Sequence, residues 1–106
     1  MIYILTKRTM KNFNRHTNIA KSYMQELHSY VQRQQGFVKA TTFWDFDGTE
    51  MYTISKWKNQ TAWNDWLKSD NRYLVSTSYN KNGILFNEHH REVAKIFNSS
   101  YDGPLL

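Results

Sequence analysis

Residues 57–70 of this chain read WKNQTAWNDWLKSD and hold three of its four tryptophans. The segment starts where an apolar run ends, and Asn59 is a residue type that caps helices by accepting a hydrogen bond from a first-turn amide. We therefore predict a helix over Asn59–Ser69, which carries Trp63 and Trp66. Burying an indole removes a large apolar area from water, so this segment belongs to a core, an interface or a binding pocket.

The chain before this segment alternates between strand-like and helix-like patterns. Ile2–Arg8 is predicted to be a strand, and apolar residues recur at helical spacing over Ile19–Val31, with Gly36 as the C-terminal glycine. Phe37–Phe46 and Met51–Trp57 are rich in β-branched and aromatic residues, which is typical of strands. The Asp-Gly pair between them favours a tight hairpin turn.

The chain after the tryptophan segment completes the domain. Asn71–Gly83 is predicted to be irregular or a short helix, and Ile84–Phe97 a long strand, although Glu88–Lys95 has helical propensity. The order β-α-β-β-α-β predicts an α+β, ferredoxin-like domain over residues 1–97, with an antiparallel sheet and its helices on one face. Residues 98–106 contain the only proline of the chain and are predicted to form a tail.

The predicted strands are apolar on both faces. In a sheet with helices on one side and water on the other, alternate positions should be polar. Here both sets of alternate positions are apolar or aromatic, as in Ile2 and Ile4 against Tyr3 and Leu5. We therefore expect a homodimer in which the free sheet faces of two copies pack together.

The composition excludes several classes of site. The chain has no cysteine, which removes disulfides, thiolate nucleophiles and Cys-zinc sites. Its net charge of +5 comes mostly from basic residues interleaved with acidic ones, so we expect no nucleic-acid partner. The apolar N-terminal run meets Lys7 and Arg8 too early for a membrane span, and we expect no membrane association and a cytoplasmic protein.

The four histidines do not predict a metal site. On a strand, the adjacent His89 and His90 point to opposite faces and cannot hold one ion. His28 lies beside the apolar face of the first helix, where it is either a pocket base or a half-buried polar residue.

With this order of elements, the chain resembles the antibiotic biosynthesis monooxygenase superfamily of dimeric α+β barrels. The resemblance is specific in three places: the Gly36-Phe37 turn, the strand-ending Trp57, and the next helix with Ala62 and Trp66. The cofactor-free members of that superfamily oxidise aromatic or quinol-like substrates in a pocket between sheet and helices. The resemblance therefore implies a cofactor-independent monooxygenase whose substrate supplies the electrons to oxygen.

The run Asp65–Asp70 is similar to the staphylococcal-type haem-degrading branch of the same superfamily. That branch uses a helix tryptophan, which Trp66 matches, and a downstream histidine that ligates iron. The position of the ligand is Ser76 here, and Thr6 occupies the region of the branch's first-strand asparagine. Haem iron needs an axial donor such as His, Cys, Met or Tyr, so we expect no cofactor, with haem as the alternative.

The candidate site follows from these patterns. Candidate catalytic residues are Trp66, Tyr73 and His28, while Trp63 and Trp57 are assigned to packing. A largely apolar small molecule is expected in a pocket whose candidate walls are Tyr23, Leu27, His28, Phe43, Trp66, Tyr73 and Phe86.

Three other functions stay open. Such a pocket would also hold a hydrophobic or fatty-acyl ligand without reacting with it, and haem degradation comes next. An RNA-recognition domain has the same order of elements and stacks bases on the aromatic residues of its sheet. Its basic-Gly-aromatic motif is missing from the third strand, Glu50–Trp57, and a dimer would bury the face that RNA needs.

Overall fold

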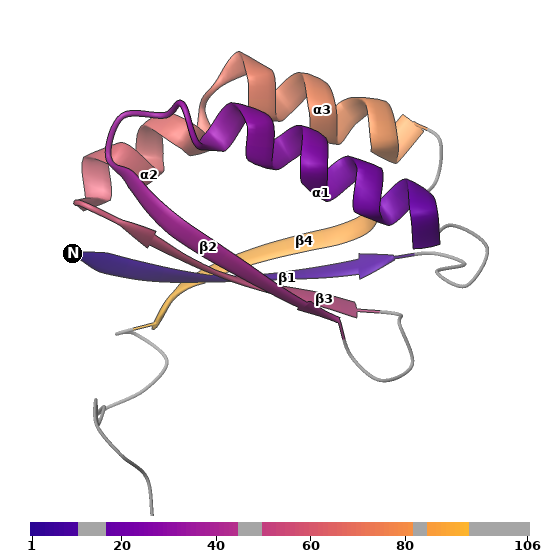
Figure 1. Cartoon of the computed structure of the whole chain (residues 1–106), viewed down its shortest axis with the longest axis horizontal. Coiled ribbons are helices and arrows are strands. Elements are labelled where there is room, and N and C mark those ends of the chain that lie inside the picture. Colours follow the sequence, from indigo (N-terminus) through magenta and orange to yellow (C-terminus); the bar gives the residue numbers. More distant parts are fainter. Residues whose placement is uncertain (11–16, 45–49, 82–84, 94–106) are drawn as a thin grey trace, which may run out of the picture.

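The computed structural model describes residues 1–10, 17–44, 50–81 and 85–93. The elements alternate as the sequence predicts, except that the second helical region is divided into two helices (Figure 1). In chain order they are β1 (Ile2–Met10), α1 (Thr17–Val31), β2 (Phe37–Trp44), β3 (Glu50–Trp57), α2 (Gln60–Leu67), α3 (Asp70–Lys81) and β4 (Leu85–Glu92).

The strands form one antiparallel sheet in the order β2-β3-β1-β4. All three helices cover the same face of this sheet, and α1 and α3 lie side by side across it (Figure 1). This is the predicted α+β, ferredoxin-like arrangement, because the first and third strands are neighbours in the middle of the sheet.

The turn between α1 and β2 depends on Gly36. Helix α1 already ends at Val31, and tight backbone turns join its end to Gly36. Gly36 has φ +87°, and a Cβ there would lie 2.4 Å from the Cβ of Ala62. The glycine therefore permits a left-handed turn and the close approach of α2. It does not terminate α1, contrary to the prediction from the sequence.

Helix α2 begins as predicted. The Asn59 side chain accepts a hydrogen bond of 2.9 Å from the backbone amide of Ala62. The cap starts the helix directly after β3, and this places Ala62, Trp63 and Trp66 on its buried side.

Helix α3 is longer than predicted: Asp70–Lys81 is one helix of 12 residues, whereas Asn71–Gly83 was expected to be irregular or to hold a short helix. Ser69 caps it by accepting a hydrogen bond of 3.2 Å from the amide of Arg72. The helix lacks a clear apolar stripe: Val75 is buried, while the neighbouring Tyr73 and Leu74 are 66% and 63% exposed. Without that stripe the periodicity that identifies a helix is weak.

The last strand is described from Leu85 to Glu92, so the residues from Glu88 to Glu92 are extended rather than helical. Pairing with β1 decides this, since backbone partners outweigh intrinsic propensity. The predicted Asp-Gly turn, the end of the predicted strand and the tail 98–106 lie outside the described residues.

The core lies between the sheet and the helices. Its most deeply buried large side chains are those of Ile4, Tyr23, Met51 and Trp57. The opposite face of the sheet carries Tyr3, Phe43 and Ile54, which are 42%, 53% and 42% exposed. The free face therefore carries exposed apolar and aromatic side chains, as the strand pattern predicts, together with lysines such as Lys7 and Lys56.

Candidate functional site: a cavity between helices and sheet

A cavity of about 270 Å³ opens between the helices and the sheet. Its size is close to the lower end of the range found for small-molecule sites. The wall combines the inward faces of β1, β2 and β3 with side chains from α1, α2 and β4. The lining residues are Thr6, Arg8, Met24, Gln25, Leu27, His28, Val31, Phe37, Ala40, Thr42, Thr53, Ser55, Trp57, Trp63, Trp66 and His90.

The cavity exists because the strands present short side chains to the helices. Thr6, Thr42 and Thr53 lie on neighbouring strands at positions paired in register, and Ala40 and Ser55 are paired in the same way. Bulky residues at these five positions would fill the space beneath α1 and α2. The helices instead rest on larger residues around this group and leave a hollow above it.

Three indoles form the apolar wall. Trp57, Trp63 and Trp66 are 1%, 6% and 5% exposed, and all three line the cavity. Trp57 is in contact with both of the others, with ring centroids 5.5 Å from Trp63 and 6.5 Å from Trp66. Trp57 and Trp63 belong to the core, as expected, and Trp66 lines the cavity; the structure adds that all three rings form one cluster on the cavity wall.

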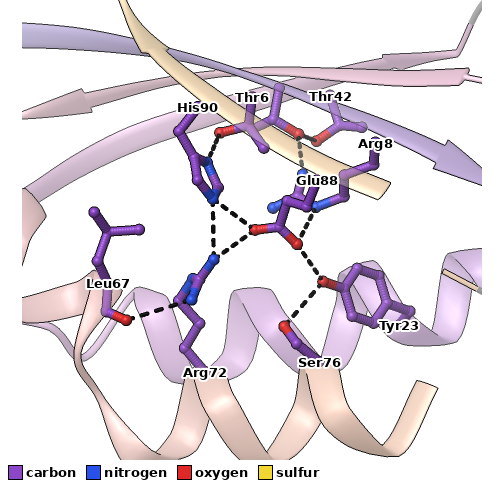
Figure 2. A network of polar contacts seen from close by, with 10 residues as sticks. Thr6, Arg8, Tyr23, Thr42, Leu67, Arg72, Ser76, Glu88 and His90 are labelled. Atoms are coloured by element: carbon purple, nitrogen blue, oxygen red, sulfur yellow. Dashed lines mark hydrogen bonds and ion pairs between the residues drawn. The ribbon is translucent and has the colours of Figure 1, made fainter. Parts of the chain in front are cut away.

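The polar end of the cavity is a connected network (Figure 2). Thr6 Oγ1 lies 2.9 Å from His90 Nδ1, and His90 Nε2 lies 2.9 Å from Glu88 Oε1. The same carboxylate accepts a hydrogen bond of 2.7 Å from Arg72 Nη2 on α3. Its other oxygen is 3.5 Å from Arg8 Nε and 3.4 Å from the Tyr23 hydroxyl. The carboxylate of Glu88 thus contacts side chains from both the sheet and the helices.

Glu88 is held in its charged form. Burial alone would raise the pKa of this carboxyl, but the hydrogen bond from His90 and the charges of Arg8 and Arg72 hold the pKa well below its usual range. Burial also raises the pKa of Tyr23, so this phenol is a neutral donor to the carboxylate. The site therefore has a fixed negative charge behind His90 and two guanidinium groups around it.

Three of the predicted wall residues lie on the cavity. Leu27 and Trp66 are buried in its wall, and His28 is an exposed residue that also lines it, which places His28 where the cavity opens. Their position follows from the helical faces on which the sequence places them.

Of the other four predicted residues, three are placed elsewhere, and the side chain of the fourth is not described. Tyr23 is fully buried behind the polar network, with its hydroxyl on Ser76 and Glu88. Phe43 is paired with Tyr52 on the free sheet face, and Tyr73 is 66% exposed on α3, so neither side chain lies on the wall. Phe86 belongs to β4, but its side chain is outside the described residues.

Sequence reasoning missed the polar residues of the site, and also apolar wall residues such as Met24, Val31 and Phe37. Thr6 and Arg8 alternate on β1, Thr53 and Ser55 on β3, and Glu88 and His90 on β4, in each case on the helix-covered face. Short hydroxyl residues at every second position of adjacent strands were the available signal, because they leave space and supply hydrogen-bond partners. His89 and His90 point to opposite faces, as predicted, with His89 exposed.

Solved structures of other proteins share this architecture. SnoaB from Streptomyces nogalater, described as a cofactor-independent oxygenase, superposes with a TM-score of 0.75 at 17% identity, over 98% of this chain and 97% of that one. An antibiotic biosynthesis monooxygenase gives 0.73 at 12% identity, over 88% and 96%. A putative antibiotic biosynthesis monooxygenase from Nitrosomonas europaea gives 0.71 at 11% identity, over 87% and 95%. No protein-family model and no curated protein matches the chain.

The chain shares the α+β, ferredoxin-like fold of these solved structures. In this fold the cavity described above lies between the sheet and the helices, where the sequence resemblance predicts the pocket. Among the described residues, no helix is both long and apolar enough to cross a membrane.

The haem-degrading branch that the run Asp65–Asp70 resembles does not fit the residues present. Ser76 occupies the position of the iron ligand, does not line the cavity, and has its hydroxyl 3.4 Å from that of Tyr23. Both ring nitrogens of His90 already have polar partners within 3.0 Å. Within the described ranges no group of three His, Asp or Glu side chains could hold a metal ion.

Proposed function

We propose that this protein binds a largely apolar small molecule in the cavity between its helices and sheet, and that it is a cofactor-independent monooxygenase. The observation that carries the proposal is the cavity itself, in which three buried indoles face a floor of small side chains. A hollow with an apolar wall and a few convergent polar groups is the usual form of a small-molecule site. An aromatic or otherwise extended hydrophobic substrate suits that wall.

The chemistry requires no metal or flavin if the substrate itself reduces oxygen. A phenol such as 1-naphthol can react with one O₂ to give 1,4-naphthoquinone and one water. One oxygen atom becomes the new carbonyl, and the other leaves as water with the hydroxyl proton and the hydrogen from the opposite ring carbon. The protein's part is to exclude water, orient the ring and stabilise the electron-rich form of the substrate. SnoaB, described as a cofactor-independent oxygenase on the same fold, supports this proposal.

The test uses 1-naphthol with ¹⁸O₂. We expect the quinone to carry one labelled oxygen and the water the other, at a rate above that in buffer alone. Ala40→Leu should fill the cavity and abolish both binding and turnover, because Ala40 lines the floor. Thr61→Leu adds similar bulk at an exposed position of α2 and should leave both unchanged. Binding and turnover that persist in Ala40→Leu would contradict the assignment of the cavity as the site.

A non-catalytic binding protein for a hydrophobic or fatty-acyl ligand is the alternative. It is favoured by the apolar wall together with the buried Arg8, whose guanidinium can donate hydrogen bonds to a carboxylate. Saturable binding of 1-naphthol or of decanoate, without consumption of oxygen, would support this alternative over the oxygenase.

We further propose that two copies pair through their free sheet faces. Tyr3, Phe43 and Ile54 form an exposed apolar set on that face, which monomeric proteins tend to avoid. Size-exclusion chromatography with light scattering should give the mass of a dimer, and Ile54→Lys should give a monomer. A monomeric wild-type chain would contradict the proposal and would leave the aromatic face free for another partner, such as single-stranded RNA.

A further inference from the structure

A row of four polar side chains crosses the sheet floor of the cavity. Thr42 on β2 is paired in register with Thr53 on β3, and Thr53 with Thr6 on β1. Thr6 is in turn paired with His90 on β4, and all four residues line the cavity. The Thr6 hydroxyl has His90 Nδ1 as its partner at 2.9 Å, whereas Thr53 Oγ1 lies 2.8 Å from Thr42 Oγ1. Thr42 and Thr53 are therefore a hydroxyl pair of their own.

Arg8 limits how this pair can place its two hydrogens. Its Nη1 donates a hydrogen bond of 3.0 Å to Thr53 Oγ1 (Figure 2). A guanidinium only donates, so Thr53 is the acceptor in this contact at any pH at which the protein is folded. In the part of the chain that the structure describes, Thr42 and Thr53 have no further hydrogen-bond partner. One hydroxyl hydrogen of the pair is therefore left for a ligand in the cavity.

Burial decides which of the two threonines keeps that hydrogen. If Thr42 donated to Thr53, the remaining hydrogen would be on Thr53, which is 6% exposed. If Thr53 donates to Thr42, the remaining hydrogen is on Thr42, which is only partly buried. A buried donor without an acceptor is costly, so the second direction is favoured. A hydroxyl that accepts from a cation is also the stronger donor, and this favours the same order, from Arg8 through Thr53 to Thr42.

We propose that Thr42 is the specificity-determining donor of the cavity and that its hydroxyl binds a carbonyl oxygen of a neutral, apolar ligand. The charge of Arg8 polarises the Thr53 hydroxyl, and Thr53 polarises that of Thr42, so each hydrogen bond strengthens the next. Thr42 touches the ligand, whereas Arg8 and Thr53 are positioning residues. This inference rests on the proposed function in the same cavity, and it adds that the ligand carries a ketone on its rings.

A carbonyl group suits this donor better than a hydroxyl or a carboxylate does. Thr42 offers one hydrogen, and a carbonyl oxygen accepts it without bringing another. A ligand hydroxyl brings a hydrogen of its own, and Thr42 cannot donate to that hydroxyl and accept from it at the same time. A carboxylate would place a full charge on one neutral donor, which is costly in an apolar cavity. The hydroxyl pair thus selects a group that only accepts.

The test is the infrared carbonyl frequency of bound 1-tetralone, because a hydrogen bond to the oxygen lowers this frequency. An engineered cavity of roughly 150 Å³ binds benzene, so a hollow of about 270 Å³ accommodates two fused rings. The difference between the ¹²C and ¹³C carbonyl forms isolates the band of the ligand from those of the protein. We expect a frequency below that of 1-tetralone in hexane. Tetralin has the same rings without the carbonyl group, and its binding, measured by calorimetry, reports on the apolar wall alone.

Variants at Thr42 test the donor itself. Thr42→Val removes the hydroxyl and keeps the shape of the side chain. It should return the bound ketone to its frequency in hexane and weaken its binding about 2- to 12-fold, which is the loss of one hydrogen bond, while tetralin binds as before. Thr42→Ser should keep both the shift and the affinity. Thr41→Val makes the same change at an exposed neighbour outside the cavity wall and should alter neither.

Variants at Thr53 test the positioning role. Thr53→Val should leave a smaller shift, because Thr42 keeps its hydroxyl but is no longer polarised by Arg8. Thr53→Ser retains an oxygen that accepts from Arg8 and should keep the whole shift. A merely structural role would change the binding of both probes and would leave the frequency of the bound ketone unchanged. Binding of tetralin by each variant shows that the cavity is intact.

The outcomes separate this inference from the function on which it rests. If both probes bind and the ketone keeps its frequency in hexane, the donor is refuted while the apolar pocket stands. If neither probe binds, the proposed function fails and the inference fails with it. A shift that persists in Thr42→Val and disappears in Thr53→Val would assign the donor to Thr53 and overturn the direction of the chain. Equal losses of affinity for the two probes in Thr42→Val would mean a packing effect and would also refute the proposal.

Discussion

Replacing Glu88 by glutamine tests the central ionic contact of this protein. The Glu88 side chain is 13% exposed and faces Arg8 and Arg72, whose side chains are 6% and 18% exposed. Removing one partner of a buried ion pair costs about 3–5 kcal/mol, because the remaining charge stays buried without compensation. Arg72 keeps some contact with water and glutamine keeps an acceptor oxygen. We therefore expect a loss of about 3 kcal/mol in the free energy of unfolding at pH 7, the lower end of that range.

The assay is urea denaturation of wild type and Glu88→Gln at several pH values. For a domain of this size, a loss of about 3 kcal/mol corresponds to a decrease in melting temperature of roughly 12–24 °C. The surrounding cations hold the folded-state pKa of Glu88 below its unfolded value of about 4.3. The stability from Glu88 is therefore present above that unfolded value and is lost as pH falls towards the folded one.

The difference between the two proteins should accordingly be large at pH 7 and should narrow once the pH falls below about 4. Asp65→Asn removes an exposed carboxylate of α2 and should leave the denaturation midpoint close to that of wild type. A loss in Glu88→Gln below about 1 kcal/mol would refute the reasoning, because surface ion pairs contribute that little. A difference that is the same at pH 3 as at pH 7 would refute the pKa argument alone.

Three further predictions concern packing and local structure, and each is read by urea denaturation. Gly36→Ala should lower the free energy of unfolding by at least about 2 kcal/mol, because of its φ of +87° and because the new Cβ would clash with Ala62. Adding Ala62→Gly should remove the clash but not the backbone strain, so full recovery of stability would contradict the backbone argument. Asn59→Ala should lower the free energy of unfolding by about 1 kcal/mol, whereas Asn59→Asp keeps the helix cap and should retain most of that stability. Equal losses of stability in the two variants would exclude the cap as the cause. Trp66→Ala should cost about 3–5 kcal/mol and enlarge the cavity; a much smaller loss would mean that the indole contributes little to packing.

The order of elements could be predicted because each signal is local. Asn59 caps α2 with its own side chain, and the strand residues are recognised by their type and alternation. Helix α3 was not predicted at its full length, because among its described residues Val75 and Tyr79 are the apolar ones packed on the core, while Tyr73 and Leu74 face outwards. Its stability comes from contact with α1, which is not visible in its own sequence pattern.

The site was predicted in part, for a related reason. Leu27, His28 and Trp66 follow from helical faces, but Phe43 faces away from the cavity because the register of β2 and β3 pairs it with Tyr52. A change of one residue in strand register reverses which side chains face the core. Predicting which aromatic residues form the wall therefore requires the pairing as well as the pattern.

The sequence by itself determined the α+β class, the cap that starts α2 and the burial of the tryptophan segment, since these depend on neighbouring residues and on the cost of exposing indoles. The tertiary structure alone decided that Trp57, Trp63 and Trp66 share one hollow, and that Arg8, Glu88 and His90 meet at its end. Residues from strands far apart in the chain come together there, and the small side chains of Thr6, Thr42 and Thr53 leave the space that only the packing of helices on a sheet can enclose.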